Sequence, residues 1–205
     1  MKNLLSFSLI FIFALLIASC AKEKKAADLS EPSAAYMIDS KNSTVQWTAF
    51  KTTAKVPVKG IFKEIIINKS NEASNPSAAL EGLEFEIPVS SIFSKDTIRD
   101  AKLNKFFFAV MENSLNLKGS FKIEDQEKGT LSLTMNGLTK DLPFDFEMSH
   151  DTILINASMD LNNWQAQAAL ESLNQACLEL HTGADGVSKT WDEVLINAKI
   201  LTVKK

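Results

Sequence analysis

From residue 36 onward, hydrophobic and polar residues alternate along most of the chain. A period of two is typical of β-strands that bury one face. The alternation is clearest at 83–89 and 142–148, where Glu, Asp and Pro separate large apolar side chains. Rows of this kind predict about eight strands, at residues 44–50, 58–67, 83–89, 115–123, 131–135, 142–148, 153–159 and 194–200. We therefore expect a mainly β fold.

The breaks between these rows have the chemistry of hairpin turns. Asn136-Gly137 separates two rows, and this pair tolerates the positive φ angles of a tight hairpin. Compact polar breaks at 125–129 and 149–151 have similar spacing. Short turns between neighbouring strands indicate an antiparallel sheet, and about eight strands can close into a barrel with room for side chains or one small ligand. An antiparallel β-barrel is therefore expected, with an open two-sheet sandwich as the competing architecture.

Two segments depart from the alternation and predict helices. Residues 94–108 have a polar N-terminal turn, with Ser94 as a candidate N-cap, and fit a short helix or lid. Residues 163–180 predict a longer amphipathic helix, which we expect to pack across a barrel mouth or wall rather than to bind a partner. Its apolar stripe, at spacings of three and four, consists of Ala166, Leu170, Leu173, Cys177 and Leu180.

The first residues have the features of a lipoprotein export signal. Lys2 precedes an apolar run that is about as long as a signal-peptide core and too short to span a bilayer comfortably. The run ends in Leu16-Ile17-Ala18-Ser19-Cys20, which resembles the bacterial lipobox, where the chain is cut before an acylated Cys. We predict a signal peptide at 1–19, lipidation of Cys20, a flexible tether at 20–35 and one domain at 36–205. An ordinary signal peptide or an uncleaved anchor is the alternative.

This reading predicts a location as well as an anchor. By the same resemblance to lipoproteins, Ala21 after Cys20, in place of Asp, favours the outer membrane. We expect a protein of the cell envelope that is lipid-anchored through Cys20 at the outer membrane. It is expected to face the periplasm, with exposure at the cell surface as the alternative.

Composition and motifs exclude several classes of function. The chain has 22 basic and 25 acidic side chains and a formal net charge of −3, which argues against nucleic-acid binding. With Cys20 lipidated, Cys177 is the remaining thiol, so no internal disulfide is expected. His150 and His181 lack partners at metal-binding spacing, and no nucleophile elbow or phosphate-binding loop occurs. We expect no enzymatic activity, metal or cofactor; an enzymatic role would need Cys177 or His181 exposed with a perturbed pKa.

Several short segments carry a family resemblance through their order and spacing across residues 36–161. They are Tyr36-Met37-Ile38-Asp39-Ser40 with Ser43, Val45 and Trp47; Gly60-Ile61-Phe62; Ser91-Ile92-Phe93-Ser94; Arg99-Asp100-Ala101-Lys102-Leu103 with Phe106-Phe107; Gly129-Thr130-Leu131; Asn136-Gly137-Leu138-Thr139-Lys140; and Ala157-Ser158-Met159-Asp160. Together they resemble the YceI-like family of polyisoprenoid-binding proteins. The helix after Trp164 and the stretch 180–191 exceed the compact ending of that family.

The resemblance implies a lipocalin-like barrel whose apolar lumen holds an isoprenoid, a quinone or another amphiphilic lipid. Inward-facing residues expected to line this lumen are Trp47, Phe62, Phe85, Leu117, Phe121, Leu133, Phe144 and Phe146. Arg99 and Asp100 are candidates for a polar rim that orients a head group, or else for helix capping and a surface ion pair. The alternative function is a solid barrel that acts as an interaction module through its C-terminal helix or loop.

Overall fold

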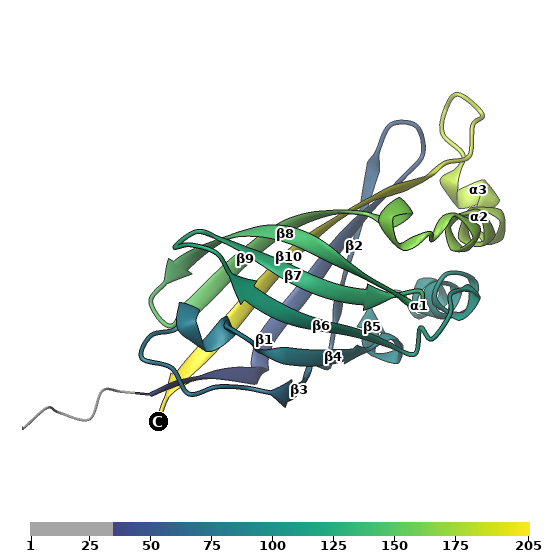
Figure 1. Cartoon of the computed structure of the whole chain (residues 1–205). Helices are drawn as coiled ribbons and strands as arrows, with labels where there is room; N and C mark the ends of the chain where they lie inside the picture. Colours follow the sequence, from purple (N-terminus) through teal and green to yellow (C-terminus); the bar gives the residue numbers. More distant parts are fainter. Residues whose placement is uncertain (1–34) are drawn as a thin grey trace, which may run out of the picture. The chain divides into compact units, whose positions relative to one another are not determined.

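In the computed structural model, residues 35–205 can be described, and they contain one ten-stranded sheet with short helices (Figure 1). All of the strand pairs are antiparallel, in the order β3-β4-β6-β7-β8-β9-β10-β1-β2-β5. The strands are β1 (Tyr36–Lys51), β2 (Val56–Phe62), β3 (Ile66–Lys69), β4 (Glu84–Pro88), β5 (Ile92–Phe93), β6 (Asn116–Ile123), β7 (Lys128–Met135), β8 (Leu138–Ser149), β9 (Thr152–Asp160) and β10 (Thr190–Lys204).

The sheet curls into a half-barrel, so the predicted mainly β, lipocalin-like fold is confirmed (Figure 1). Within residues 35–205 there are ten strands instead of about eight. The row at 58–67 divides into β2 and β3, and the two-residue strand β5 pairs with the end of β2. The short strands β3 and β5 form the two edges of the sheet, where brevity limits the unpaired backbone that an edge exposes.

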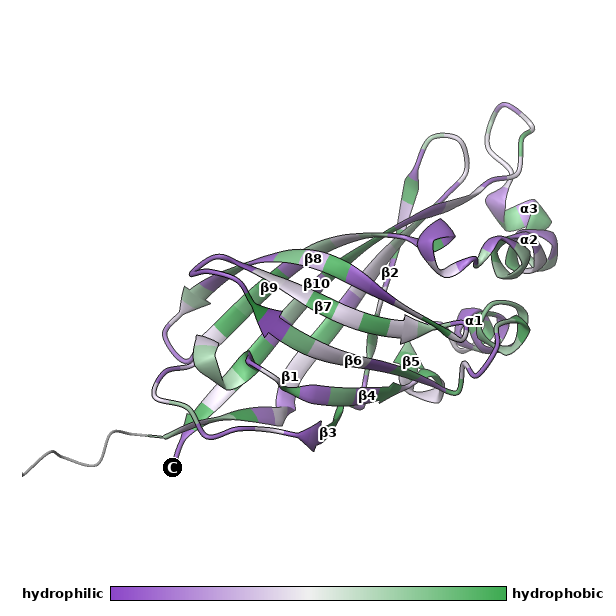
Figure 2. Cartoon of the chain, in the orientation of Figure 1, coloured by the Kyte–Doolittle hydropathy of each residue, from purple (hydrophilic) through white to green (hydrophobic). Residues whose placement is uncertain are grey.

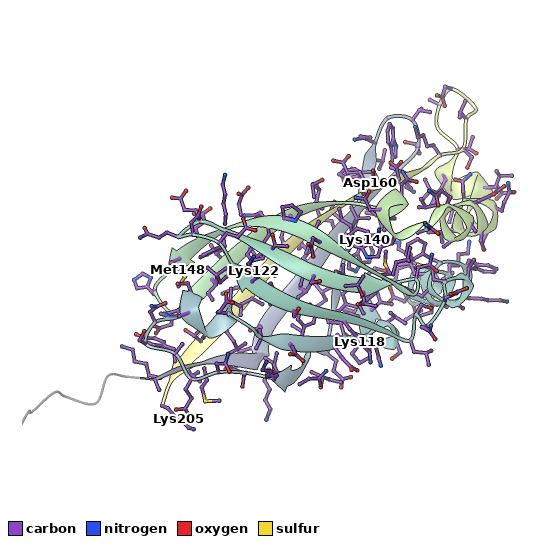
Figure 3. All side chains as sticks on the ribbon, in the orientation of Figure 1. Lys118, Lys122, Lys140, Met148, Asp160 and Lys205 are labelled. Atoms are coloured by element: carbon purple, nitrogen blue, oxygen red, sulfur yellow. The ribbon has the colours of Figure 1, made fainter. Side chains whose placement is uncertain are left out.

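Side chains alternate between the two faces of the curled sheet. In β8, for example, Leu142, Phe144 and Phe146 are buried while the residues between them are exposed. Figure 2 shows the same alternation as green and purple bands along the strands. Lys118 and Lys122 of β6, labelled in Figure 3, lie on the outer face, and both are exposed. The inner face is therefore apolar and the outer face charged, as expected for a sheet with one solvated side.

Local polar groups determine where strands bend and turn. Asn136 and Gly137 have φ angles of 51° and 69°, which confirms the predicted tight turn between β7 and β8. The register of β1 against β10 shifts between Asp39 and Thr44. At this bulge the Ser43 hydroxyl donates to the Asp39 carbonyl and accepts from the Leu201 amide, at 2.7 and 3.0 Å. Both hydrogen bonds satisfy backbone groups that the interrupted ladder leaves free.

The helices are α1 (Thr97–Phe106), α2 (Gln167–Ala176) and α3 (Leu178–His181), with 3-10 turns η1 (Ser77–Leu80), η2 (Val89–Ser91), η3 (Phe108–Val110) and η4 (Leu161–Trp164). The N-cap of α1 is Asp96 rather than the candidate Ser94, because the Asp96 carboxylate accepts from the amides of Ile98 and Arg99. No helix within residues 35–205 is long and apolar enough to cross a membrane.

The single helix predicted at 163–180 is divided into η4, α2 and α3. Cys177 has φ −121° and ψ 20°, outside the α-helical region, and so separates α2 from α3. Cys177 is buried, as expected from the stripe, whereas Leu180 is 59% exposed, so its place on the buried stripe was wrong.

Candidate functional site: the cavity inside the sheet

An apolar cavity of about 180 Å³ lies on the inner face of the curled sheet. Every one of the ten strands contributes to its lining, together with Leu103 of α1 and both Leu170 and Leu173 of α2. None of the described residues that line it carries a formal charge. A buried water needs roughly 10–15 Å³ and two or more polar partners, so this space is large enough for a ligand and too apolar to hold ordered water well.

Buried side chains pack at the two ends of the cavity. Helices α1 and α2 lie at one end, next to the turn that follows β7 (Figure 1), and both contribute to the lining. Trp164 is fully buried there without lining the cavity, and its indole nitrogen donates to the Leu133 carbonyl at 3.0 Å. At the opposite end, Leu80 of η1 and Ile153 of β9 are fully buried and also lie outside the lining. Buried side chains outside the lining therefore pack at both ends of the curled sheet.

The structure brings most of the predicted lumen residues together. The cavity lining includes seven of the eight, namely Trp47, Phe62, Phe85, Leu117, Phe121, Leu133 and Phe144. Phe146 is 2% exposed but does not belong to the lining. Its ring packs against Phe144 with centroids 6.1 Å apart, so it supports the wall at the end of a row of rings. Ligand contact by the seven lining residues stays a prediction.

Aromatic rings form two groups within this lining. Phe121 lies 5.5 Å from both Phe85 and Phe144, measured between ring centroids. Phe108 lies 5.1 Å from Phe107 and 6.4 Å from Phe62, below the helical cover. Edge-to-face pairs such as Phe121–Phe144 are favourable geometries for aromatic side chains. Each of these rings therefore packs against at least one other ring of the lining.

Three glycines allow inward rings to lie against the sheet, and the sequence analysis missed this role. Trp47, Phe85 and Phe144 are directly opposite Gly60, Gly119 and Gly129 on neighbouring strands. A Cβ on Gly60 would lie 2.6 Å from Trp47 Cε2, and one on Gly119 would lie 2.7 Å from Phe85 Cζ. Glycine within a strand marks such close approaches. Which ring lies opposite which glycine depends on the strand register, and the sequence alone does not give that register. The only sequence signal for these close approaches was a glycine within an alternating row.

Arg99 and Asp100, predicted as a polar rim, make their contacts around the N-terminus of α1. Asp100 accepts hydrogen bonds from the Ser94 amide and hydroxyl at 2.9 and 2.6 Å. Arg99 forms an ion pair with Asp96 at 3.4 Å, and both are partly exposed. Neither Arg99 nor Asp100 lines the cavity. These contacts match the capping and surface ion pair that were the alternative, and a head-group role stays a prediction.

Polar residues at the helical end form a connected network. His181 Nδ1 and Thr190 Oγ1 are 2.6 Å apart, and the Thr190 hydroxyl donates to the Asn174 side-chain oxygen at 2.9 Å. Since that hydroxyl has one proton, His181 Nδ1–H is the donor to Thr190. Burial, together with the smaller effect of the positive charges of Lys51 and Lys102, lowers the pKa of His181 to about 4. The imidazole is therefore neutral at physiological pH.

The free thiol of Cys177 is buried between α2 and α3, in keeping with a small core residue. Within residues 35–205, no three His, Cys, Asp or Glu side chains gather in a group that could hold a metal ion. Cys20, the predicted lipidation site, lies outside the described residues.

A second hollow, of about 460 Å³, lies on the outer side of the sheet where β8 and β9 separate. These strands pair only from Asp145 to Ser149 of β8, so the preceding half of β8 has no β9 partner. Pro143, which has no amide proton to donate, lies in that half. The outer hollow and the inner cavity share Phe144 and Ala157 as lining residues. The wall is therefore a single layer of side chains at this point.

Comparisons with known proteins identify the fold and the family. The chain has a TM-score of 0.60 and 12% identity to a polyisoprenoid-binding domain from Saccharophagus degradans implicated in plant cell wall breakdown, covering 84% of this chain and 99% of that one. For BcnA of Burkholderia cenocepacia the TM-score is 0.51 and the identity 17%, covering 81% and 99%. At these identities the likeness concerns the fold alone. No curated protein matches the sequence. The family model of the YceI-like domain matches residues 36–201, so the chain belongs to the YceI-like family.

Proposed function

We propose that this protein is a non-catalytic, lipid-anchored protein of the cell envelope that binds an isoprenoid, a quinone or another lipid in its cavity. The observation that carries the proposal is the cavity of about 180 Å³, which is lined from all ten strands by residues without a formal charge. Membership of the YceI-like family and the fold shared with a polyisoprenoid-binding domain support it. An alternative, in which a solid barrel docks a partner, would be expected to have a filled interior.

The energetics of apolar binding favour a long-chain ligand. Each buried methylene contributes about 0.8 kcal/mol, while association costs at least about 4 kcal/mol in lost freedom. Micromolar affinity therefore requires roughly fifteen buried carbons. A dry cavity of about 150 Å³ admits one benzene ring. A chain of fifteen carbons must consequently displace lining side chains, or the helical cover formed by α1 and α2, when it enters.

The ligand can be identified by extraction from the purified protein. Full-length protein from membranes is washed, extracted with organic solvent and analysed by mass spectrometry. We expect a long-chain lipid in near-stoichiometric amount. Ala198→Leu projects three further carbons into the cavity from β10. If the lipid is bound in the cavity, this variant should carry much less of it than the wild type. A lipid-free wild-type protein that also fails to take up added isoprenoid or quinone would contradict the proposal.

The anchor can be tested separately from the ligand. Cys20→Ala should release the protein into the soluble periplasmic fraction, because the acylated residue is lost. Cys177→Ala removes the other thiol and should leave the protein in the membrane fraction. If Cys20→Ala stays with the membrane, the lipid anchor is wrong, although binding in the cavity could still hold.

A further inference from the structure

The inner cavity is smaller than the ligand that the proposed function requires. Micromolar binding through apolar contacts needs roughly fifteen buried carbons, whereas a dry cavity of about 150 Å³ admits one benzene ring. The inner cavity measures about 180 Å³. Most of a long-chain ligand must therefore occupy space outside this cavity, either by displacing its walls or by reaching a neighbouring hollow.

The outer hollow between β8 and β9 is such a neighbouring space. It measures about 460 Å³, and Phe144 of β8 and Ala157 of β9 line both this hollow and the inner cavity. Phe144 is 4% exposed, whereas Ala157 is partly exposed although it lines the inner cavity. These two side chains therefore lie between the two spaces.

The wall can open at this point without loss of ladder hydrogen bonds between strands. The last pair between β8 and β9 is Asp145 with Asn156, so the two strands have already separated at Phe144 and Ala157. The preceding residue of β8, Pro143, has no amide proton to donate. Elsewhere in the sheet, an opening between paired strands would break hydrogen bonds of the ladder. A chain that passes between Phe144 and Ala157 has to displace side chains alone.

Polarity changes from one side of this wall to the other. None of the described residues that line the inner cavity carries a formal charge. Most residues that line the outer hollow are polar, namely Glu124, Lys128, Asp145, Asn156, Ser158 and Asn197. The inner cavity therefore suits an apolar tail, and the outer hollow suits a head group that forms hydrogen bonds. Two carboxylates beside one ammonium group disfavour an anionic head group there.

We propose that the outer hollow is the head-group site of the bound lipid. The apolar tail passes between Phe144 and Ala157 into the inner cavity, and an uncharged head group with a hydroxyl or an amide remains in the hollow. This placement rests on the proposed function and deepens it, because it fixes where the ligand crosses the wall. It differs from the expectation drawn from the sequence, in which Arg99 and Asp100 of α1 orient the head group.

A nitroxide on the head group reports its position directly. Delipidated full-length protein labelled with ¹⁵N is mixed with palmitamido-TEMPO, whose uncharged nitroxide broadens the signals of nearby amides. The backbone amides of Ser158 and Asn197 should lose most of their intensity, whereas the amides of α1 and α2 should keep theirs. Reduction of the nitroxide with ascorbate should restore the lost signals. Acetamido-TEMPO, which has the same head group and no tail, is the matched control and should broaden neither set.

Matched serine substitutions test the same site through affinity. Ser158→Trp fills the hollow, whereas Ser132→Trp adds the same ring to the outer face of β7, away from the hollow. The affinity for farnesol should fall about tenfold in Ser158→Trp and less than about twofold in Ser132→Trp. Wild-type protein should bind farnesol more tightly than farnesyl phosphate, because the hollow disfavours an anion.

The outcomes separate the head-group site from lipid binding itself. Broadening at α1 and α2 instead of at Ser158 and Asn197, or no broadening by bound palmitamido-TEMPO, overturns the inference while lipid binding stands. Equal losses of farnesol affinity in Ser158→Trp and Ser132→Trp, or tighter binding of farnesyl phosphate, overturn it as well. The nitroxide measurement uses the wild type, so it remains decisive if Ser158→Trp does not fold. If the wild type binds none of these lipids, the proposed function itself fails.

Discussion

Cross-strand glycines determine how the largest rings sit on the inner face of the sheet. Trp47, Phe85 and Phe144 each occupy the space that a Cβ on the opposite glycine would fill. The arrangement leaves the middle of the barrel open, because each ring lies along the wall rather than across the lumen. It also means that even Gly→Ala at Gly60, Gly119 or Gly129 would place a methyl group against a ring.

Replacing Gly60 by Ala should displace the Trp47 indole. The new methyl would lie 2.6 Å from Trp47 Cε2, and the Phe93 carbonyl at 3.0 Å limits movement of the strand. Overpacking of this kind typically costs about 1–3 kcal/mol of unfolding free energy. Chemical denaturation should show this loss, together with a change in tryptophan fluorescence. Lys59→Ala, at the neighbouring exposed position, should change neither, and a Gly60→Ala variant as stable as the wild type would contradict the close packing.

Residue-level sequence reasoning identified the apolar lining but not its polar exceptions. Trp47 and Phe121 were expected inside because they occupy inward positions of alternating rows, and both line the cavity. Both Phe144 and Phe146 are buried, and whether a buried ring lines the cavity depends on its height along the barrel, which the alternating pattern does not record. Trp47 Nε1 is buried without a hydrogen-bond partner, which is a result of three-dimensional packing that the pattern does not record.

His181 should make the stability of the domain depend on pH. Its pKa is about 4 in the folded protein and about 6.5 in an unfolded chain, chiefly because of burial. Between these values the unfolded state binds a proton that the folded state does not, so acidification from pH 6.5 to 4 favours unfolding. We expect a loss of roughly 1–2 kcal/mol, allowing for solvent screening at this half-buried side chain.

The measurement is urea denaturation at intervals across this pH range. His181→Gln cannot acquire the charge and should show a flatter profile between pH 4 and 6.5. The carboxylates with lowered pKa values, such as Asp96, titrate in both proteins and cancel in the comparison. Parallel profiles for the wild type and His181→Gln would show that His181 does not contribute.

At the level of secondary structure, two lysines hold the helical cover together. Lys102 of α1 donates to the Ala176 carbonyl at the C-terminus of α2, at 2.9 Å. Lys51 of β1 donates to the Leu180 carbonyl in α3, at 3.0 Å. Cations at helix C-termini satisfy unpaired carbonyls and interact favourably with the helix dipole. These bonds link α2 to α1, and α3 to the sheet, over one end of the cavity.

Removing one of these links should loosen the cover. Lys102→Met keeps most of the aliphatic stem and loses the bond to Ala176, at a cost of about 1 kcal/mol. Hydrogen exchange of the α2 amides should accelerate about fivefold, with strands such as β7 unchanged. Lys105→Met, on an exposed position of the same helix, is the matched control. Equal exchange in both variants would show that Lys102 does not restrain α2.

Element boundaries were predictable where the pattern was long and uniform, and unpredictable where the chain changes direction. The alternation of β8 and β9 was sufficient to place both strands. The apolar row at 58–67 hides the separation of β2 from β3, because apolar residues such as Ile65 continue through the break. The stripe from Ala166 to Leu180 likewise continues through Cys177, whose backbone leaves the helix. Hydrophobic spacing records which side chains are buried, and both breaks leave that spacing nearly intact.

For the whole molecule, the cavity implies that a substitution that fills it should raise the free energy of unfolding and lower the affinity for lipid. Ala198→Leu places three further carbons in the cavity, which should raise the free energy of unfolding of the lipid-free protein by roughly 1 kcal/mol. The same change should reduce lipid affinity, since the ligand loses that space. Thermal unfolding with and without added lipid measures both effects. Lys199→Leu, which faces outwards, should leave lipid affinity unchanged. A destabilised Ala198→Leu protein would indicate that the interior is already full.

The first and last strands of the domain are neighbours in the sheet, with Tyr36 opposite Lys204. A contact between residues so far apart in sequence must overcome a large loss of chain entropy before any hydrogen bond forms. Until β10 arrives, both β1 and β9 keep an open edge that can pair with another chain. We therefore expect folding in milliseconds to seconds rather than microseconds, and aggregation of chains that end before Thr190.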